Sequence, residues 1–163
     1  MARAWALCSV ALCVVLSVGA CQGGGAAAAK RTSDDLGAEI GRAYLKMMDE
    51  VGAAVATSSD PATIHPLIDQ LKAKYVDTFV ALGRQREALA PGDREKCDTT
   101  AMSAMRQMSD ETLQAIDAAA TACKESDPEL AKHFAELERI TRYVNFDQLR
   151  TQLPDEAARL GVR

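Results

Sequence analysis

The sequence predicts an all-α fold, specifically an antiparallel up-down four-helix bundle followed by a short C-terminal helix. Apolar residues recur every three or four positions in four long segments, the spacing that places them on one side of a helix. No segment shows the strict alternation of apolar and polar residues, or the richness in β-branched residues, that is typical of strands. Short loops separate the four segments, as they do between neighbouring antiparallel helices of such bundles.

The first two helices are expected at residues 33–56 and 61–89. Asp34 and Asp35 favour a helix start because carboxylates interact well with the positive end of the helix dipole. Asp60 and Pro61 form a second start signal, an aspartate cap followed by a proline at the first helical position. The residues expected to face the core from these two helices are Leu36, Ile40, Tyr44, Met47, Val51, Ala54, Ile64, Leu67, Leu71, Tyr75, Phe79 and Leu82.

The third helix is expected at about residues 99–124. The fourth begins at Pro128, because Asp127 and Pro128 repeat the earlier start signal. Its apolar pattern continues to Val144, and residues 145–147 are a candidate break. Pro154 then starts a short terminal helix that ends near residue 160.

The N-terminal residues have the form of an export signal. Arg3 supplies a positive start, and residues 5–16 are apolar except for two cysteines and one serine. The sixteen residues at positions 5–20 are fewer than the ~20 that a membrane-spanning helix needs. We therefore expect residues 1–20 to be a signal peptide that is removed.

The end of this leader, Val18-Gly19-Ala20-Cys21, resembles the lipobox of bacterial lipoproteins. The resemblance covers the leader only, and it implies that the Cys21 thiol carries a diacylglycerol and that a peptidase cuts before this cysteine. Because Gln22 follows, and not the aspartate that retains such proteins in the inner membrane, it also implies an outer-membrane lipid anchor facing the periplasm. The alternative is an ordinary secretory signal cut near Ala20, which releases a soluble protein.

Behind the leader we expect a lipidated flexible tether at residues 21–32 and a helical-bundle domain at residues 33–163. Residues 22–30 are mostly glycine and alanine, with nothing to bury, although the alanines at 26–29 could instead extend the first helix. Loss of residues 1–20 removes only one charged residue, Arg3, so the formal net charge changes from −4 to −5. This mild acidity argues against nucleic-acid binding, which usually needs a clustered basic face.

Two cysteines remain in the mature domain, Cys97 and Cys123, and an even pair in an oxidising compartment suggests a disulfide. A continuous third helix would hold them about 39 Å apart, whereas a bridge needs Cα atoms within ~7 Å. Either the chain folds back near residues 107–110, where Ser109 or Asp110 could cap a new helix, or the thiols stay free or pair between molecules. The two alternatives are nearly balanced, and the compartment tips the prediction toward an intramolecular bridge with a break.

The two histidines are expected to be structural. His133 has Glu129 and Glu136 nearby in sequence, but the two Glu-x-x-His motifs of di-iron bundles are absent. His65 is expected on the surface at a helix end. A haem held between Met47 or Met48 and His133 is disfavoured because their levels in an antiparallel pair differ by roughly 6 Å.

Met102, Met105 and Met108 lie along one side of the expected third helix, and thioethers at this spacing suit copper(I). Packing in the core is the favoured interpretation, because methionine readily fills irregular gaps.

No hydrolytic triad, glycine-rich phosphate loop or paired-carboxylate motif is recognisable, so we predict no catalytic residue, no cofactor, no metal site and no enzymatic activity. The expected function is that of a lipid-anchored envelope lipoprotein that serves as a binding, interaction or structural module with an envelope protein as partner. The alternative is a haem- or copper-binding helical carrier in the periplasm.

Overall fold

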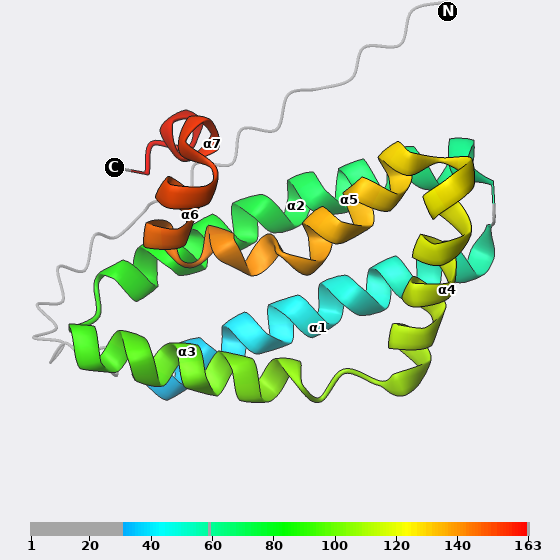
Figure 1. Ribbon diagram of the computed structural model, residues 1–163. Helices are drawn as coiled ribbons and strands as arrows, with labels where there is room; N and C mark the ends of the chain where they lie inside the picture. The colour runs from blue at the N-terminus through cyan, green and yellow to red at the C-terminus, as the bar shows by residue number, and fades with distance from the viewer. Residues whose placement is uncertain (1–30, 59, 163) are drawn as a thin grey trace, which may run out of the picture. The chain divides into compact units, whose positions relative to one another are not determined.

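Figure 1 shows a computed structural model of the chain, which describes residues 31–58 and 60–162. The predictions for the leader, the Cys21 lipid and nearly all of the tether lie outside the described residues. Every regular element that the structure describes is a helix, which confirms the all-α fold class. The elements are α1 (Ser33–Thr57), α2 (Pro61–Glu87), α3 (Pro91–Met105), α4 (Asp110–Ser126), α5 (Pro128–Glu138), the 3-10 helix η1 (Ile140–Tyr143), α6 (Phe146–Gln152) and α7 (Pro154–Arg159).

The expected starts of α2, α5 and α7 at prolines are confirmed. A carboxylate oxygen of Asp60 accepts the backbone N–H of Ala62 at 3.2 Å, and one of Asp127 accepts that of Leu130 at 3.1 Å. The start of α1 is fixed by a capping box between Thr32 and the carboxylate three residues later. These caps satisfy N–H groups that have no acceptor inside the helix.

The segment expected to form the third helix, at about residues 99–124, forms two helices. α3 begins earlier, at Pro91, and ends at Met105, while α4 begins at Asp110. Ser109 caps α4 by accepting the N–H of Thr112 at 3.1 Å. The break near residues 107–110, toward which the sequence analysis leaned, is therefore confirmed, and the Ser109 cap fixes the start of the new helix.

The expected fourth helix also ends early, at Glu138, and the short η1 follows. The candidate break at residues 145–147 is confirmed only at Asn145, which caps α6 by accepting the N–H of Gln148 at 3.2 Å, whereas the next two residues are helical. α6 itself was not expected.

α1 and α3 pack closely and run parallel to each other (Figure 1). Gly37 lies against Cys97 near the start of α3, and Gly41, one turn further along α1, lies against Ala104. A Cβ atom at Gly37 would lie 2.4 Å from the Cys97 carbonyl oxygen, and one at Gly41 would lie 2.3 Å from the Ala104 Cβ. Only glycine allows two helix backbones to approach this closely.

α4 packs on the C-terminal half of α1 and then crosses toward α5 (Figure 1). Thr112, near the start of α4, lies against Gly52 of α1, and its hydroxyl donates to an Asp49 carboxylate oxygen at 3.0 Å. α4 is therefore a crossing helix between the segment that ends in α3 and the segment that begins with α5.

α2 and α5 form a second parallel pair. The Lys72–Glu136 ion pair and the His65–Asp127 hydrogen bond join them, and residue numbers rise together along both helices. α1 and α2, which follow each other in the chain, run in opposite directions (Figure 1).

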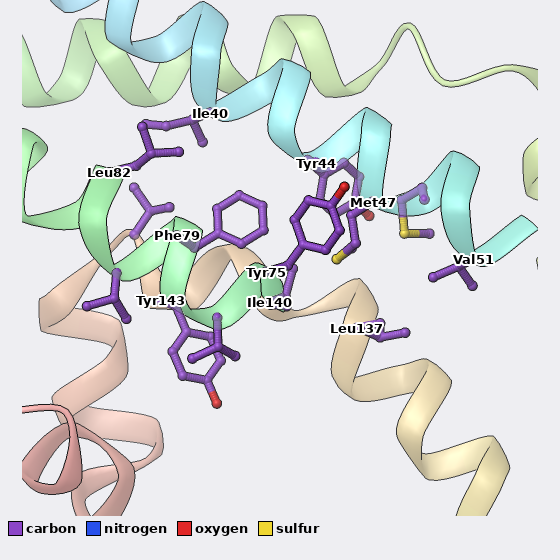
Figure 2. Packing of buried hydrophobic residues seen from close by; sticks show 14 of the residues in the cluster. Ile40, Tyr44, Met47, Val51, Tyr75, Phe79, Leu82, Leu137, Ile140 and Tyr143 are labelled. Atoms are coloured by element: carbon purple, nitrogen blue, oxygen red, sulfur yellow. The ribbon is translucent and has the colours of Figure 1, made fainter. Parts of the chain in front are cut away.

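The core lies between α1, α2 and the segment formed by α5 and η1. Most of the residues expected in it are buried, but Leu67 is 37% exposed, and Ile68 takes its place with 0% exposure. Leu67 belongs to the correct helix, but it lies one position away from the buried face. Figure 2 shows the centre of this cluster, formed by Ile40, Tyr44, Met47, Val51, Tyr75, Phe79, Leu82, Leu137, Ile140 and Tyr143.

A third glycine, Gly83 of α2, allows the segment between η1 and α6 to pack closely against α2. A Cβ atom there would lie 2.5 Å from Cε1 of Phe146 and 2.9 Å from the carbonyl oxygens of Tyr143 and Val144. This glycine therefore fixes the position of residues 143–146 on α2.

We predict that Gly41→Ala lowers the free energy of unfolding by about 1–3 kcal/mol, because the added methyl overpacks the contact with α3. Gly92→Ala is the matched control, since Gly92 also lies in a helix and a methyl group added there would have no neighbouring atom within 4 Å. That control should leave stability unchanged or raise it by up to ~1 kcal/mol. Urea unfolding followed by circular dichroism measures both, and equal effects would contradict the close helix contact.

Candidate functional site: a methionine-lined groove

Two adjoining hollows lie between α3 and the segment of residues 138–148. The first has a volume of about 190 Å³ and the second about 260 Å³, and they share Met102, Met105 and Thr141. We call the two together the methionine groove. The residues that line only the first are Ile40, Asp98, Ala101, Val144, Asn145 and Gln148, and those that line only the second are Tyr44, Arg106, Met108 and Glu138.

The expectation that Met102 packs in the core is wrong, because its side chain is 57% exposed. Met105 and Met108 are half-buried at the edge of the core. Met47 and Met48, by contrast, are buried at 0% and 3% exposure. The cause is the close contact of Gly37 and Gly41 with α3. The small residues of α3 face α1 at this contact, and its methionines therefore face the groove.

The charges of the groove lie at its rim and have both signs. Arg106 and Glu138 line the second hollow, and Asp98 lines the first. The pKa of the Tyr44 hydroxyl is raised, mainly because burial disfavours its charged form and also because Glu138 lies nearby. Tyr44 therefore remains a neutral member of the wall.

Asp98 is held by a buried arginine that sequence reasoning missed. Arg86, with 5% exposure, donates from Nε and Nη2 to the two Asp98 carboxylate oxygens, both at 2.6 Å, and from Nη1 to Glu87 at 3.1 Å. These hydrogen bonds raise the pKa of the Arg86 guanidinium, and the bond to Asp98 contributes most. Helical spacing could have indicated that Arg86 is buried, because it lies four residues after Leu82 and continues the apolar stripe of α2.

The structure brings the two histidines together, which the sequence did not predict. Their rings meet edge to face with centroids 5.4 Å apart, and Nε2 of His65 lies 3.0 Å from a carboxylate oxygen of Asp127. Nδ1 of His133 lies 3.2 Å from Asp69, without hydrogen-bond alignment. His65 lies near the start of α2, as expected, and its side chain is 30% exposed where it faces Asp127 at the start of α5.

The Asp127 carboxylate does two jobs, since it caps α5 and accepts from His65. Its pKa is lowered first by the backbone N–H of Leu130 and then by His65. Among the described residues no group of three or more His, Cys, Asp or Glu side chains is arranged to hold a metal ion. The two histidines and their carboxylate neighbours form a polar link between α2 and α5.

The expected disulfide is absent, and Cys97 and Cys123 are free and buried. Cys97 lies beside Gly37 near the start of α1, whereas Thr112, near the start of α4, lies beside Gly52. Those two levels of α1 are about 22 Å apart at 1.5 Å per residue. Because α4 then crosses toward α5, the helix break does not return Cys123 to Cys97, and a bridge needs Cα atoms within ~7 Å.

A polar hollow of about 240 Å³ lies between α2, η1 and α7. Its carboxylates are already paired, Glu136 with Lys72 and Glu156 with Arg159, and these partners lower both carboxyl pKa values. The Tyr143 hydroxyl donates to Glu156 at 3.3 Å, and burial and this carboxylate raise its pKa to about 12. Because these charged and polar groups already satisfy one another, the methionine groove is the better candidate for a ligand.

Comparison with models of protein families, with curated protein sequences and with solved structures found no match to this chain. None of the helices in the described part of the chain is both long enough and apolar enough to cross a bilayer.

We predict that neither Cys97 nor Cys123 reacts with iodoacetamide in the folded protein, and that both react fully after unfolding. They are 0% and 6% exposed, and burial raises both thiol pKa values, so little thiolate is accessible. Mass spectrometry of the peptides that contain each cysteine measures the labelling. A linked peptide pair, lighter by two hydrogens under non-reducing conditions, would contradict the free thiols.

Proposed function

We propose that this chain is a lipid-anchored envelope lipoprotein that binds an envelope protein through the methionine groove and catalyses no reaction. The observation that carries the proposal is the 57% exposure of Met102 in an apolar hollow, although the chain has a well-filled core. The lipobox-like segment at residues 18–21 supports the location, at the outer membrane and facing the periplasm.

The chemistry of the groove favours a protein side chain as its occupant. Methionine is flexible and polarisable, so a methionine wall can adapt to apolar groups of a partner. Taken one at a time, the hollows of about 190 and 260 Å³ are smaller than the roughly 300–1,000 Å³ typical of sites for larger ligands, so each suits an apolar side chain of a partner.

We also propose that α1, α2, α3 and α5 are the four helices of an up-down bundle, with α4 added in the last connection. The alternation of direction along these four helices supports this assignment. The contact of α1 with α3 is unusually close for two parallel members of such a bundle, and the glycines at its centre account for it.

The lipid anchor is tested by feeding cells an alkyne-tagged fatty acid and detecting the label on the protein. We expect Cys21→Ser to abolish labelling and processing, because the thioether to lipid cannot form. Cys13→Ser is the matched control, since it changes a leader cysteine outside the lipobox, and it should label normally. Full labelling of Cys21→Ser would exclude the lipoprotein assignment.

Docking is tested with a photo-crosslinking amino acid placed at position 102 in intact cells. We expect one envelope protein to be attached reproducibly at this position, because the side chain there is exposed within the groove. The control position is Leu113, which is 38% exposed on α4 and outside the groove. Equal crosslinking to the same protein from both positions, or none from position 102, would count against the groove.

A further inference from the structure

The three methionines Met102, Met105 and Met108 line one hollow, together with Tyr44, Arg106, Glu138 and Thr141. We propose that this hollow is a thioether site for a soft monovalent cation, copper(I). The proposal concerns one end of the methionine groove, and it requires neither the lipid anchor nor the protein partner.

Backbone geometry explains why three residues at intervals of three share one side. Met102 and Met105 lie one turn apart on α3, which places their side chains next to each other. After α3 the chain continues in i to i+3 turns. The N–H of Gln107 donates to the Ala104 carbonyl oxygen at 3.0 Å, and the N–H of Met108 donates to the Met105 carbonyl oxygen at 3.2 Å. Residues three apart eclipse each other in such i to i+3 turns, so Met108 follows Met105 into the hollow.

These thioethers are also accessible and adjustable. Met102 is 57% exposed, and Met105 and Met108 are half-buried, so an ion reaches them without unfolding the core. Unbranched methionine side chains can reorient around an ion at little cost. The core itself is filled without Met102, so packing does not account for a large apolar side chain at this exposed position.

The donor set selects the ion. Thioether sulfur prefers copper(I) over hard cations such as magnesium or calcium, which need oxygen ligands. The hollow contains no cysteine and no histidine, the usual ligands of zinc. Three sulfurs suffice for a trigonal copper(I) site, and the Glu138 carboxylate offsets the positive charge of Arg106 at the rim.

The first test uses silver(I) as a redox-inert substitute for copper(I), added to the full chain in detergent micelles after accessible thiols have been blocked. Methionine methyl groups are labelled with carbon-13 and followed by NMR. We expect the signals of Met102, Met105 and Met108 to shift together and saturate at one ion per chain. Met47 and Met48 are internal controls, because they are buried at 0% and 3% exposure and should not shift.

The second test measures copper(I) affinity by competition with a chromophoric chelator. Replacing Met102, Met105 and Met108 by leucine together should weaken binding by more than about tenfold, because volume is kept and the sulfurs are removed. Met102→Leu alone changes an exposed side chain that folding does not need, and it should also weaken binding. Met48→Leu is the control for a methionine elsewhere, and it should leave the affinity unchanged.

Silver shifts confined to other residues, or equal copper affinity of the triple variant and the parent chain, would overturn the site. A failure here leaves the docking proposal intact, because crosslinking from position 102 does not depend on metal. Conversely, metal binding without any crosslinked protein would support the copper site and contradict the proposal that the groove binds a protein partner.

Discussion

The close contact between α1 and α3 determines much of this structure. Gly37 and Gly41 lack the side-chain atoms that would hold the two helices apart, so the backbone of α3 lies directly on α1. α3 consequently buries only small residues, such as Cys97 and Ala101, at this contact. Its larger apolar side chains then have no place in the core, and Met102 and Met105 line the groove.

This contact also explains which parts of the fold the sequence could predict. α1 and α2 bury regular stripes of large apolar residues, so their periodicity located them almost to the residue. α3 has no such stripe, because small residues form its buried face, and periodicity misplaced its start by eight residues, at 99 and not at Pro91. The informative signal was the pair of glycines four residues apart in α1, each of which weakens a helix and therefore calls for a packing reason.

The candidate site was predictable in its parts and not in its arrangement. The sequence singled out Met102, Met105 and Met108 and weighed copper(I) against core packing, but exposure decides between these, and exposure depends on how α3 meets α1. Arg86 lies in the apolar phase of α2, and only the three-dimensional position of Asp98 shows that its charge is compensated. The meeting of His65 with His133 follows from the parallel pairing of α2 and α5, which a single sequence does not reveal.

Both walls of the methionine groove are fixed by glycine contacts. One wall is α3, which is seated on α1 through Gly37 and Gly41, and the other includes Val144, which is seated on α2 through Gly83. Since α1 and α2 are joined by the core, close backbone contacts fix the positions of both walls. Such a groove needs little rearrangement to accept a ligand, which lowers the entropic cost of binding. Adaptability is left to the methionine side chains, so the groove combines a rigid frame with a flexible lining.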